Sequence, residues 1–148
     1  MKIYLGSDHN GYELRTKLAE FLKRSGFEVV DEGDQKPNPN DDFPVFASRV
    51  VSAIRTSDDF EARGILICGS GQGMCMAANR FRGIRAALCW NLIEAKSSRN
   101  DDNSNVLCLS ATSTSLKEAE PIVITWLSTP FAGAARFKRR LTELDNLS

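Results

Sequence analysis

Short apolar runs and longer amphipathic stretches alternate along the whole chain. The short runs are bounded by glycine or polar residues, as is typical of buried strands. Between them, apolar side chains recur at helical spacing, for example at Leu14, Leu18 and Leu22. The pattern predicts strands at residues 3–5, 27–30, 64–68, 86–90 and 106–109, and helices at residues 12–25, from residue 44 onward, and at 74–80, 92–99, 115–127 and 134–144.

Local signals indicate where several of these helices begin and end. The stretch from Asn10 to Glu13 resembles a capping box with asparagine in first place, and Ser115 to Glu118 has the capping-box residues themselves. Gly26 is suited to end the first long helix. Pro121 falls inside the helix at 115–127, so we expect it to weaken or kink that helix.

The regular alternation of strands and helices predicts an α/β fold with a parallel sheet. The run at residues 64–68 is apolar throughout, which is typical of a strand covered on both faces. We therefore expect a single doubly wound, Rossmann-like domain over residues 1–148, with a five-stranded parallel sheet and helices on both faces. A chain of 148 residues can bury ~70% of its unfolded surface without disulfide bonds.

The composition indicates which binding partners and which cellular compartment to expect. Apolar residues make up 42% of the chain, charged residues 26%, and the net charge is zero, so nothing favours nucleic acid or an anionic membrane as a partner. No apolar run approaches the ~20 residues of a membrane span. One histidine and four cysteines without C-x-x-C spacing make a metal site unexpected. Free cysteines, and a first strand that leaves no room for a signal peptide, favour the cytoplasm.

Two polar motifs follow predicted strands. The first, from Gly6 to Gly11, contains Asp8 and His9, and the second continues from Cys68 through a glycine-rich loop. The carboxyl ends of parallel strands meet at one edge of a sheet, where open α/β folds bind ligands. The loop consists of Gly69, Ser70, Gly71, Gln72 and Gly73, just before a helix.

A glycine loop at the start of a helix can bind phosphate or a developing oxyanion, because backbone N–H groups there lack partners. The alternative is a tight turn without a ligand. The loop is neither a Walker loop nor a dinucleotide fingerprint. Cys68, directly before it, is either a base or nucleophile with a lowered pKa or a small buried side chain. Asp8 could orient a substrate hydroxyl. His9 could bind phosphate or transfer a proton, and the alternative is a lone surface histidine.

Two later segments carry charge. Arg136 and Arg140 share one face of the last helix, which suits a phosphate group but is also common on solvated surfaces. Asp101 and Asp102 precede the last strand and are either loop residues or a general acid and base.

Taken together, these motifs resemble the type B ribose-5-phosphate isomerases, a family that includes the galactose-6-phosphate isomerase subunits of lactose operons. The similarity extends from about Lys2 to Leu144. It rests on Gly6, Asp8, His9 and Gly11, on Ile67 to Gly73, on Ala77 to Arg80, on Gly83 to Ala86, on Asn105 to Leu107, and on Arg136 and Arg140.

The resemblance implies cofactor-free and metal-free interconversion of aldose and ketose phosphates through an enediolate. By position, Cys68 is expected to move the proton between C1 and C2, and Ser70 to assist transfer between the oxygens. The amides of Gly71, Gln72 and Gly73 would bind the enediolate. Asp8 would hold substrate oxygens, and His9, Arg136 and Arg140 would bind phosphate. Family members form dimers, often paired into tetramers, with active sites shared between subunits.

The chain departs from the family pattern at several positions. Asp101 stands where the family has its ring-opening histidine, and Asp102 replaces the following asparagine. We expect Asp101 to take over ring opening. Thr112 replaces a phosphate-binding arginine, Phe43 a tyrosine, and Phe137 a frequent histidine.

The leading hypothesis is isomerisation of ribose 5-phosphate to ribulose 5-phosphate. The alternatives are isomerisation of another pentose or hexose phosphate, or a family member that binds sugar phosphate without efficient catalysis. A flavin- or nucleotide-binding module is much less favoured, because no dinucleotide fingerprint supports it.

Overall fold

The protein contains a five-stranded sheet in which every neighbouring pair of strands is parallel. The computed structural model describes residues 1–147. The strands are β1 (Lys2–Ser7), β2 (Glu28–Asp31), β3 (Arg63–Cys68), β4 (Ala86–Leu88) and β5 (Val106–Ser110), in the order β2-β1-β3-β5-β4. The predicted α/β class and five-stranded parallel sheet are confirmed.

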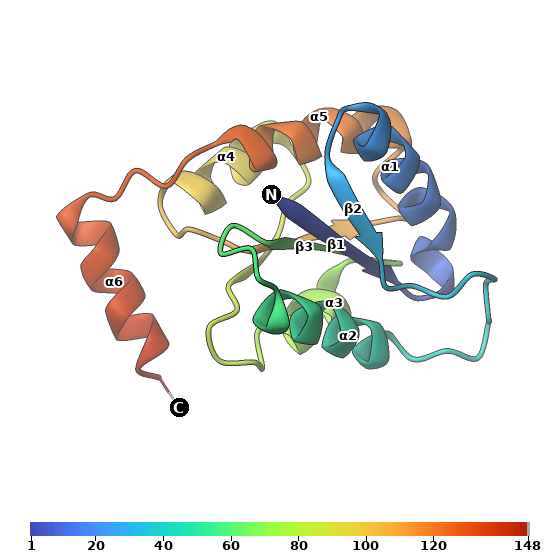
Figure 1. The fold of residues 1–148 in the computed structure, drawn as a ribbon, viewed down its shortest axis with the longest axis horizontal. Coiled ribbons are helices and arrows are strands. Elements are labelled where there is room, and N and C mark those ends of the chain that lie inside the picture. Colours follow the sequence, from blue (N-terminus) through green and yellow to red (C-terminus); the bar gives the residue numbers. More distant parts are fainter. Residues whose placement is uncertain (148) are drawn as a thin grey trace.

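Helices cover both faces of the sheet (Figure 1). They are α1 (Tyr12–Arg24), α2 (Phe43–Thr56), α3 (Gln72–Ala78), α4 (Leu92–Asn100), α5 (Leu116–Ser128) and α6 (Ala135–Asp145), with a short 3-10 turn, η1, at His9–Gly11. Helices α1, α4 and α5 contribute to one hydrophobic core, and α2 and α3 to the other. The sheet is therefore the middle of three layers.

Strand β3 shows why its sequence is apolar without interruption. Ile65 and Ile67 belong to the core under α1 and α5, whereas Leu66 and Cys68 belong to the core under α2 and α3. Successive side chains of a strand point to opposite faces. Because both faces are covered, all of these positions are buried.

The helix ends follow the sequence signals with one exception. Ser115 and Glu118 form the expected capping box of α5, and α5 continues past Pro121 to Ser128. Gly26 follows α1 with φ +88°, as a helix-ending glycine does. The expected Asn10 cap is wrong: the capping residue is Asp8, whose carboxylate accepts from the Gly11 amide, and it caps η1.

Helix α6 is the element least attached to the sheet. It stands beside the body of the molecule rather than on either face (Figure 1). Its buried residue is Phe137, and its end is tied to the body by an ion pair between Arg85 Nη1 and Asp145 Oδ1 at 3.5 Å. Within residues 1–147, no helix has the combination of length and apolar character required to cross a membrane.

Candidate active site

The carboxyl ends of β1 and β3 lie side by side at the point where the sheet order changes direction. From β1 the chain passes to β2 on one side of it and then to β3 on the other. Such a switch point is where open α/β sheets bind their ligands. Ser7 pairs with Ile67, so Asp8 and Cys68 are the next residues on adjacent strands.

The turn η1 rests directly on the end of β3 because residue 11 is glycine. A Cβ at Gly11 would lie 2.5 Å from the carbonyl oxygen of Ile67, so no larger residue fits without displacement. In the same turn, Asp8 accepts a hydrogen bond from the Gly11 amide at 3.1 Å, and Asn10 lies against Gly69. The turn therefore brings Asp8 and His9 next to the glycine loop, as the sequence predicted.

His9 forms a hydrogen-bonded pair with Asp41, which sequence reasoning did not single out. One carboxylate oxygen of Asp41 accepts from the His9 ring Nδ1 at 2.7 Å and from the His9 amide at 3.1 Å. The Asp41 side chain is 8% exposed, and that of His9 is 31% exposed. The hydrogen bond to Asp41, and the charges of Asp41 and Asp8, raise the pKa of His9. The pair directs Nε2 away from Asp41 and favours the protonated ring.

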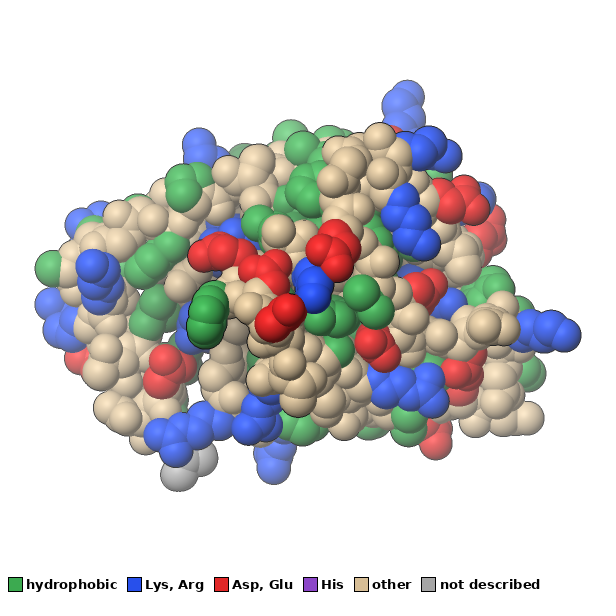
Figure 2. Space-filling model, viewed as in Figure 1, with side chains coloured by type: hydrophobic (Ala, Val, Ile, Leu, Met, Phe, Trp, Pro, Cys, Tyr) green, Lys and Arg blue, Asp and Glu red, His purple; other side chains and the backbone are tan. Residues whose placement is uncertain are grey.

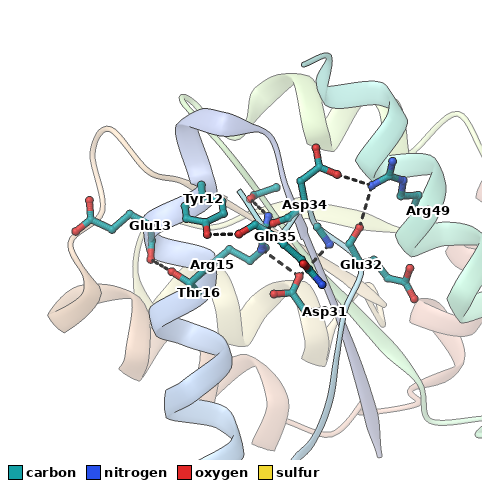
Figure 3. A network of polar contacts seen from close by, with 11 residues as sticks. Tyr12, Glu13, Arg15, Thr16, Asp31, Glu32, Asp34, Gln35 and Arg49 are labelled. Atoms are coloured by element: carbon teal, nitrogen blue, oxygen red, sulfur yellow. Dashed lines mark hydrogen bonds and ion pairs between the residues drawn. The ribbon is translucent and has the colours of Figure 1, made fainter. Parts of the chain in front are cut away.

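The loop that carries Asp41 is anchored at its beginning by Arg15 (Figure 3). This guanidinium is almost fully buried and donates to Ser7 Oγ at 2.8 Å and to the Asp34 carbonyl at 2.5 Å, with Asp31 Oδ1 3.1 Å from its Nε. Gly33 has no side chain where Arg15 lies, since a Cβ there would overlap the guanidinium. Arg15 thus connects strand β1, helix α1 and the loop that leads to His9's partner.

The glycine loop is held at the same edge by β5. The carbonyl of Gly69 accepts from Ser110 Oγ at 2.8 Å and from the Thr112 amide at 3.0 Å. Gly71 has φ +76°, and a Cβ on it would lie 2.5 Å from Leu88 Cδ1 and 2.9 Å from the carbonyl carbon of Leu109. Glycine at this position is required both by the backbone conformation and by the close packing.

The side chains of Cys68, Ser70 and Gln72 at this edge differ in exposure. Cys68 is 5% exposed at the end of β3, whereas Ser70 and Gln72 are exposed. Ser70 Oγ accepts a hydrogen bond from the Gln72 amide at 3.3 Å. Phe43, where the family pattern has tyrosine, lies over Gly73 with ring atoms about 3 Å from the position a Cβ would take. We call Asp8, His9, Cys68 and the loop from Gly69 to Gly73 the carboxyl-edge cluster.

Another thiol has a perturbed pKa. The pKa of Cys75 is lowered to about 7, chiefly by a hydrogen bond from Cys108 and further by the Leu88 backbone and Asn79. Its Sγ contacts the Ala86 carbonyl at 3.4 Å and Asn79 Nδ2 at 3.6 Å. Cys75 is thus engaged with β4 and its own helix. Burial raises the pKa of Cys89 to about 11, as expected for a core thiol.

The remaining candidate residues lie at the opposite edge of the sheet. Val106 at the start of β5 pairs with Gly64, whereas Ser110 at its end pairs with Cys68. Asp101 and Asp102 precede β5, so within one chain they lie beyond the amino ends of the strands. At about 3.3 Å per residue, the length of β5 alone separates the edges by more than 10 Å.

The acidic pair is accompanied by the basic face of α6. Burial raises the pKa of Asp102, the negative charge of Asp101 raises it further, and Arg140 opposes both. Asp101 accepts from the Asn100 side-chain amide at 2.7 Å. Basic side chains gather over α6 at the left of Figure 2. Arg136 and Arg140 are both exposed, and the Arg136 guanidinium lies 4.4 Å from the centre of the Phe137 ring. We call Asp101, Asp102, Arg136 and Arg140 the amino-edge cluster.

Asp8, His9 and Asp41 are the group of potential metal ligands that the described residues bring together, with one ligand atom from each within 4.8 Å of the others. The His9–Asp41 contact of 2.7 Å is shorter than the spacing of about 3.3 Å between two ligands on a tetrahedral zinc ion. A hydrogen-bonded imidazole–carboxylate pair fits this geometry better than a metal centre.

Comparison with known proteins identifies the family to which this chain belongs. The family model described as Ribose/Galactose Isomerase matches residues 3–144. This chain belongs to the ribose/galactose isomerase family. It is 37% identical over 141 residues to ribose-5-phosphate isomerase B of Mycobacterium tuberculosis, covering 95% of this chain and 86% of the relative.

Solved structures of family members have the same fold. Ribose-5-phosphate isomerase B of Clostridium thermocellum superposes with a TM-score of 0.92 at 41% identity, covering 98% of this chain and 95% of that one. The enzyme of Mycoplasma genitalium, solved with bound ribulose-5-phosphate, superposes with a TM-score of 0.90 at 41% identity, covering 97% and 93%.

Two residues that position the site were missed by sequence reasoning. Ser110 ends β5 at the same edge as Cys68, so the carboxyl-end rule that selected Asp8 could also have selected Ser110. Asp41 lies in a polar loop, and no pattern in the sequence connects it with His9.

Replacement of Gly71 by alanine tests whether the loop conformation and its packing both matter. Gly71→Ala is expected to lower the free energy of unfolding by about 2–4 kcal/mol, since it adds left-handed strain to a steric clash. Gly83 is a matched control, with φ +83° and nothing within 4 Å of an added Cβ. Gly83→Ala should cost about 1–2 kcal/mol. Equal losses in urea denaturation would show that packing against Leu88 and Leu109 contributes nothing.

Proposed function

We propose that this protein interconverts ribose 5-phosphate and ribulose 5-phosphate through an enediolate, without metal or cofactor. The observation that carries the proposal is the carboxyl-edge cluster: a buried thiol, Cys68, at the end of β3, followed by a glycine loop and flanked by Asp8 and His9. The names of the relatives support this substrate, as does the ribulose-5-phosphate bound to the Mycoplasma genitalium enzyme.

In the proposed reaction, Cys68 as thiolate removes the proton from C2 of the open-chain aldose. The electron pair moves into the C1–C2 bond and gives an enediolate, whose negative oxygen the amides of Gly71, Gln72 and Gly73 bind. Amides in the first turn of a helix have no acceptor within the helix. The Gln72 amide donates to Ser70 Oγ at 3.3 Å, and the substrate oxygen would replace this contact. Cys68 exchanges its thiol proton with solvent and delivers a proton to C1, while Ser70 moves a proton from the oxygen on C2 to the oxygen on C1. The product is the ketose, and no electrons leave the substrate.

The phosphate would be bound by His9 from the carboxyl-edge cluster and by Arg136 and Arg140 from the amino-edge cluster. Asp8, fixed by the Gly11 amide, would accept hydrogen bonds from substrate hydroxyls. Asp41 holds the His9 ring and maintains its charge, which suits a phosphate dianion.

The two clusters lie at opposite edges of one chain, so one substrate cannot contact both. We therefore propose a homodimer, alone or paired into a tetramer, in which the amino-edge cluster of one copy completes the carboxyl-edge cluster of the other. Helix α6 stands off the body, as an element that contacts a partner does (Figure 1). Beside the edge strand β4, Trp90 and Ile93 are 61% and 72% exposed, which supports a buried interface there.

Asp101 is proposed as the ring-opening group in place of histidine. Burial and the charge of Asp101 raise the pKa of the neighbouring Asp102, which supports the presence of a proton at this acidic pair. The same substitution motivates the second candidate, a family member that binds sugar phosphate and turns it over poorly. The four cysteines are free, which supports a reducing compartment such as the cytoplasm.

Cys68→Ala tests the base. We expect kcat for ribose 5-phosphate in a coupled assay to fall about a thousandfold, because general-base catalysis is lost while the fold is kept. Cys68→Ser should lose nearly as much, since a hydroxyl is a far weaker acid than a thiol. Cys89→Ala, which changes a buried thiol outside the cluster, should keep most of the activity. If Cys68→Ala remains active, another group is the base.

Asp41→Asn tests the pairing with His9. Asp41 raises the pKa of the His9 ring above its ordinary value of about 6.5. Below pH 6.5 the ring is therefore charged in both proteins. As the pH rises, the ring of the variant loses its charge at a lower pH than the ring of the wild type. KM should therefore rise most just above pH 6.5 and little at pH 5.5, with kcat nearly unchanged. The neighbouring Asp42→Asn is the matched control. A pH-independent rise in KM, or an equal effect of Asp42→Asn, would refute the pairing.

Mixed subunits test the shared site. Cys68→Ala and the double variant Arg136→Ala/Arg140→Ala should each be inactive alone. Random mixing of the two should restore about a quarter of wild-type activity, since half of the dimers are mixed and each has one intact site. No restoration, although subunit exchange is demonstrated by mass spectrometry, would place all three residues in a site formed by one chain.

Asp101→Asn tests ring opening. Ribose 5-phosphate is mostly cyclic, whereas ribulose 5-phosphate cannot close a furanose ring through its phosphorylated C5. The variant should therefore slow ketose formation far more than it slows exchange of the ketose C1 proton with solvent. Equal losses in the two assays would mean that Asp101 serves the isomerisation step or the structure instead.

A further inference from the structure

A second basic site lies at the amino edge of the sheet, apart from both clusters. It is a pocket of about 370 Å³ at the start of β3 and before β5. Four arginines line it, together with two asparagines and two carboxylates: Arg55, Arg63, Arg85, Arg99, Asn103, Asn105, Asp59 and Glu61. We call it the arginine pocket. No member of the amino-edge or the carboxyl-edge cluster lines it.

Two of its arginines are buried with neutral partners. Arg63 is 6% exposed, and its Nη1 donates to the carbonyls of Trp126 and Leu127 at 3.2 and 3.0 Å. Arg99 is 5% exposed and donates to the carbonyls of Thr129 and Ser104. The carbonyls of Trp126, Leu127 and Thr129 lie at the end of α5 and carry partial negative charge, so they hold the two guanidiniums in place without neutralising them. The side-chain oxygen of Asn103, which also accepts from Arg99, is neutral as well.

Their positive charges lack a counter-ion in the part of the chain that the structure describes. Neither Arg63 nor Arg99 forms an ion pair there within 4.0 Å. The nearby Asp59 is occupied by the Met1 amino group and by backbone amides. Burial, and then the charge of Arg63, lower the pKa of Arg99 to about 10, while Glu61 opposes this. Buried charges without a partner are costly, so an anion here would be stabilising.

Part of each guanidinium remains available to a ligand. Within residues 1–147, no hydrogen bond occupies Nε or Nη2 of Arg63, or Nη2 of Arg99. These three nitrogens are also accessible to solvent. Among the described residues, Arg15 Nε is the one side-chain nitrogen or oxygen that is both inaccessible to solvent and without a hydrogen-bond partner. The Nε–Nη2 edge of Arg63 matches two oxygens of one phosphate, and Arg99 adds Nη2, since its Nε donates to Thr129.

We propose that the arginine pocket binds a small dianionic oxyanion, namely inorganic phosphate or the phosphate group of a phosphomonoester, between Arg63 and Arg99. The anion would connect the start of β3 to the segment from Arg99 to Asn105, which also carries Asp101 and Asp102. Arg85 strengthens this segment through a hydrogen bond from its Nε to the Asn103 carbonyl at 3.1 Å. Occupancy would thus stabilise the loop that presents the acidic pair.

The test separates this pocket from the proposed substrate site. The variant Arg136→Gln/Arg140→Gln removes the proposed phosphate ligands of α6, and inorganic phosphate is titrated into it by calorimetry at constant ionic strength. We expect phosphate to bind saturably, and we expect chloride not to bind in its place. Adding Arg63→Gln should raise Kd about tenfold or more, as loss of a charge-assisted hydrogen bond does. Adding Arg63→Lys should weaken binding less, and Arg24→Gln, an exposed control on α1, should leave it unchanged.

A measurement without a pocket mutation covers the case in which Arg63→Gln does not fold. In ¹⁵N-labelled Arg136→Gln/Arg140→Gln protein, phosphate should shift the Nε–H resonances of Arg63 and Arg99 along one saturable curve. Ribose 5-phosphate is titrated in parallel, and the tighter ligand identifies the source of the phosphate. Absence of saturable shifts at these two arginines with either ligand, or binding unaffected by a folded Arg63→Gln, would overturn the proposal.

Discussion

The parallel pairing of β1 with β3 positions every group of the carboxyl-edge cluster. It places the two strand ends in register, with Ser7 opposite Ile67, and thereby sets Asp8 beside Cys68. Three glycines make the close approach possible: Gly11 on the Ile67 carbonyl, Gly71 on Leu109, and Gly73 under the Phe43 ring. Proximity of this kind is what an enediolate mechanism requires, because a base and several N–H donors must reach adjacent carbons of one substrate.

The same parallel arrangement separates the rest of the candidate residues. A segment before a strand lies at the amino edge, so Asp101 and Asp102 cannot approach Cys68 in their own chain. The basic α6, tied to the body through Asp145, extends from that same region (Figure 1). The proposed second copy would resolve the conflict between one substrate and two distant clusters. Assembly would then be part of catalysis rather than an addition to it.

Much of this arrangement could be predicted from the sequence, because it depends on local pattern. The all-apolar β3 indicated a strand covered on both faces, and the Ser115–Glu118 capping box marked the start of α5. The glycine loop and the Asp8–His9 motif followed from where strands end. The predicted cap at Asn10 was wrong because Asp8, two residues before Asn10, accepts the hydrogen bond from the Gly11 amide. It does so in a 3-10 turn that the sequence pattern does not indicate.

Contacts between distant segments could not be predicted in this way. Asp41 meets His9 because buried Arg15 fixes the beginning of its loop, and that depends on Ser7, Asp31 and the Asp34 carbonyl together (Figure 3). The arginine pocket likewise joins side chains of α2, β3 and α4 with the segments before β4 and β5. Neither has a spacing that a single sequence can display.

Proton exchange at the substrate tests the central claim most directly, that the carboxyl-edge cluster forms an enediolate. Ribose 5-phosphate is incubated with the protein in deuterated water, and deuterium at C2 of the recovered aldose is measured by mass spectrometry and NMR. The account predicts incorporation at C2 that depends on Cys68 and is lost in Cys68→Ala. Conversion of ribose 5-phosphate without any exchange in aldose or ketose, or no exchange with any sugar phosphate at high protein concentration, would contradict it.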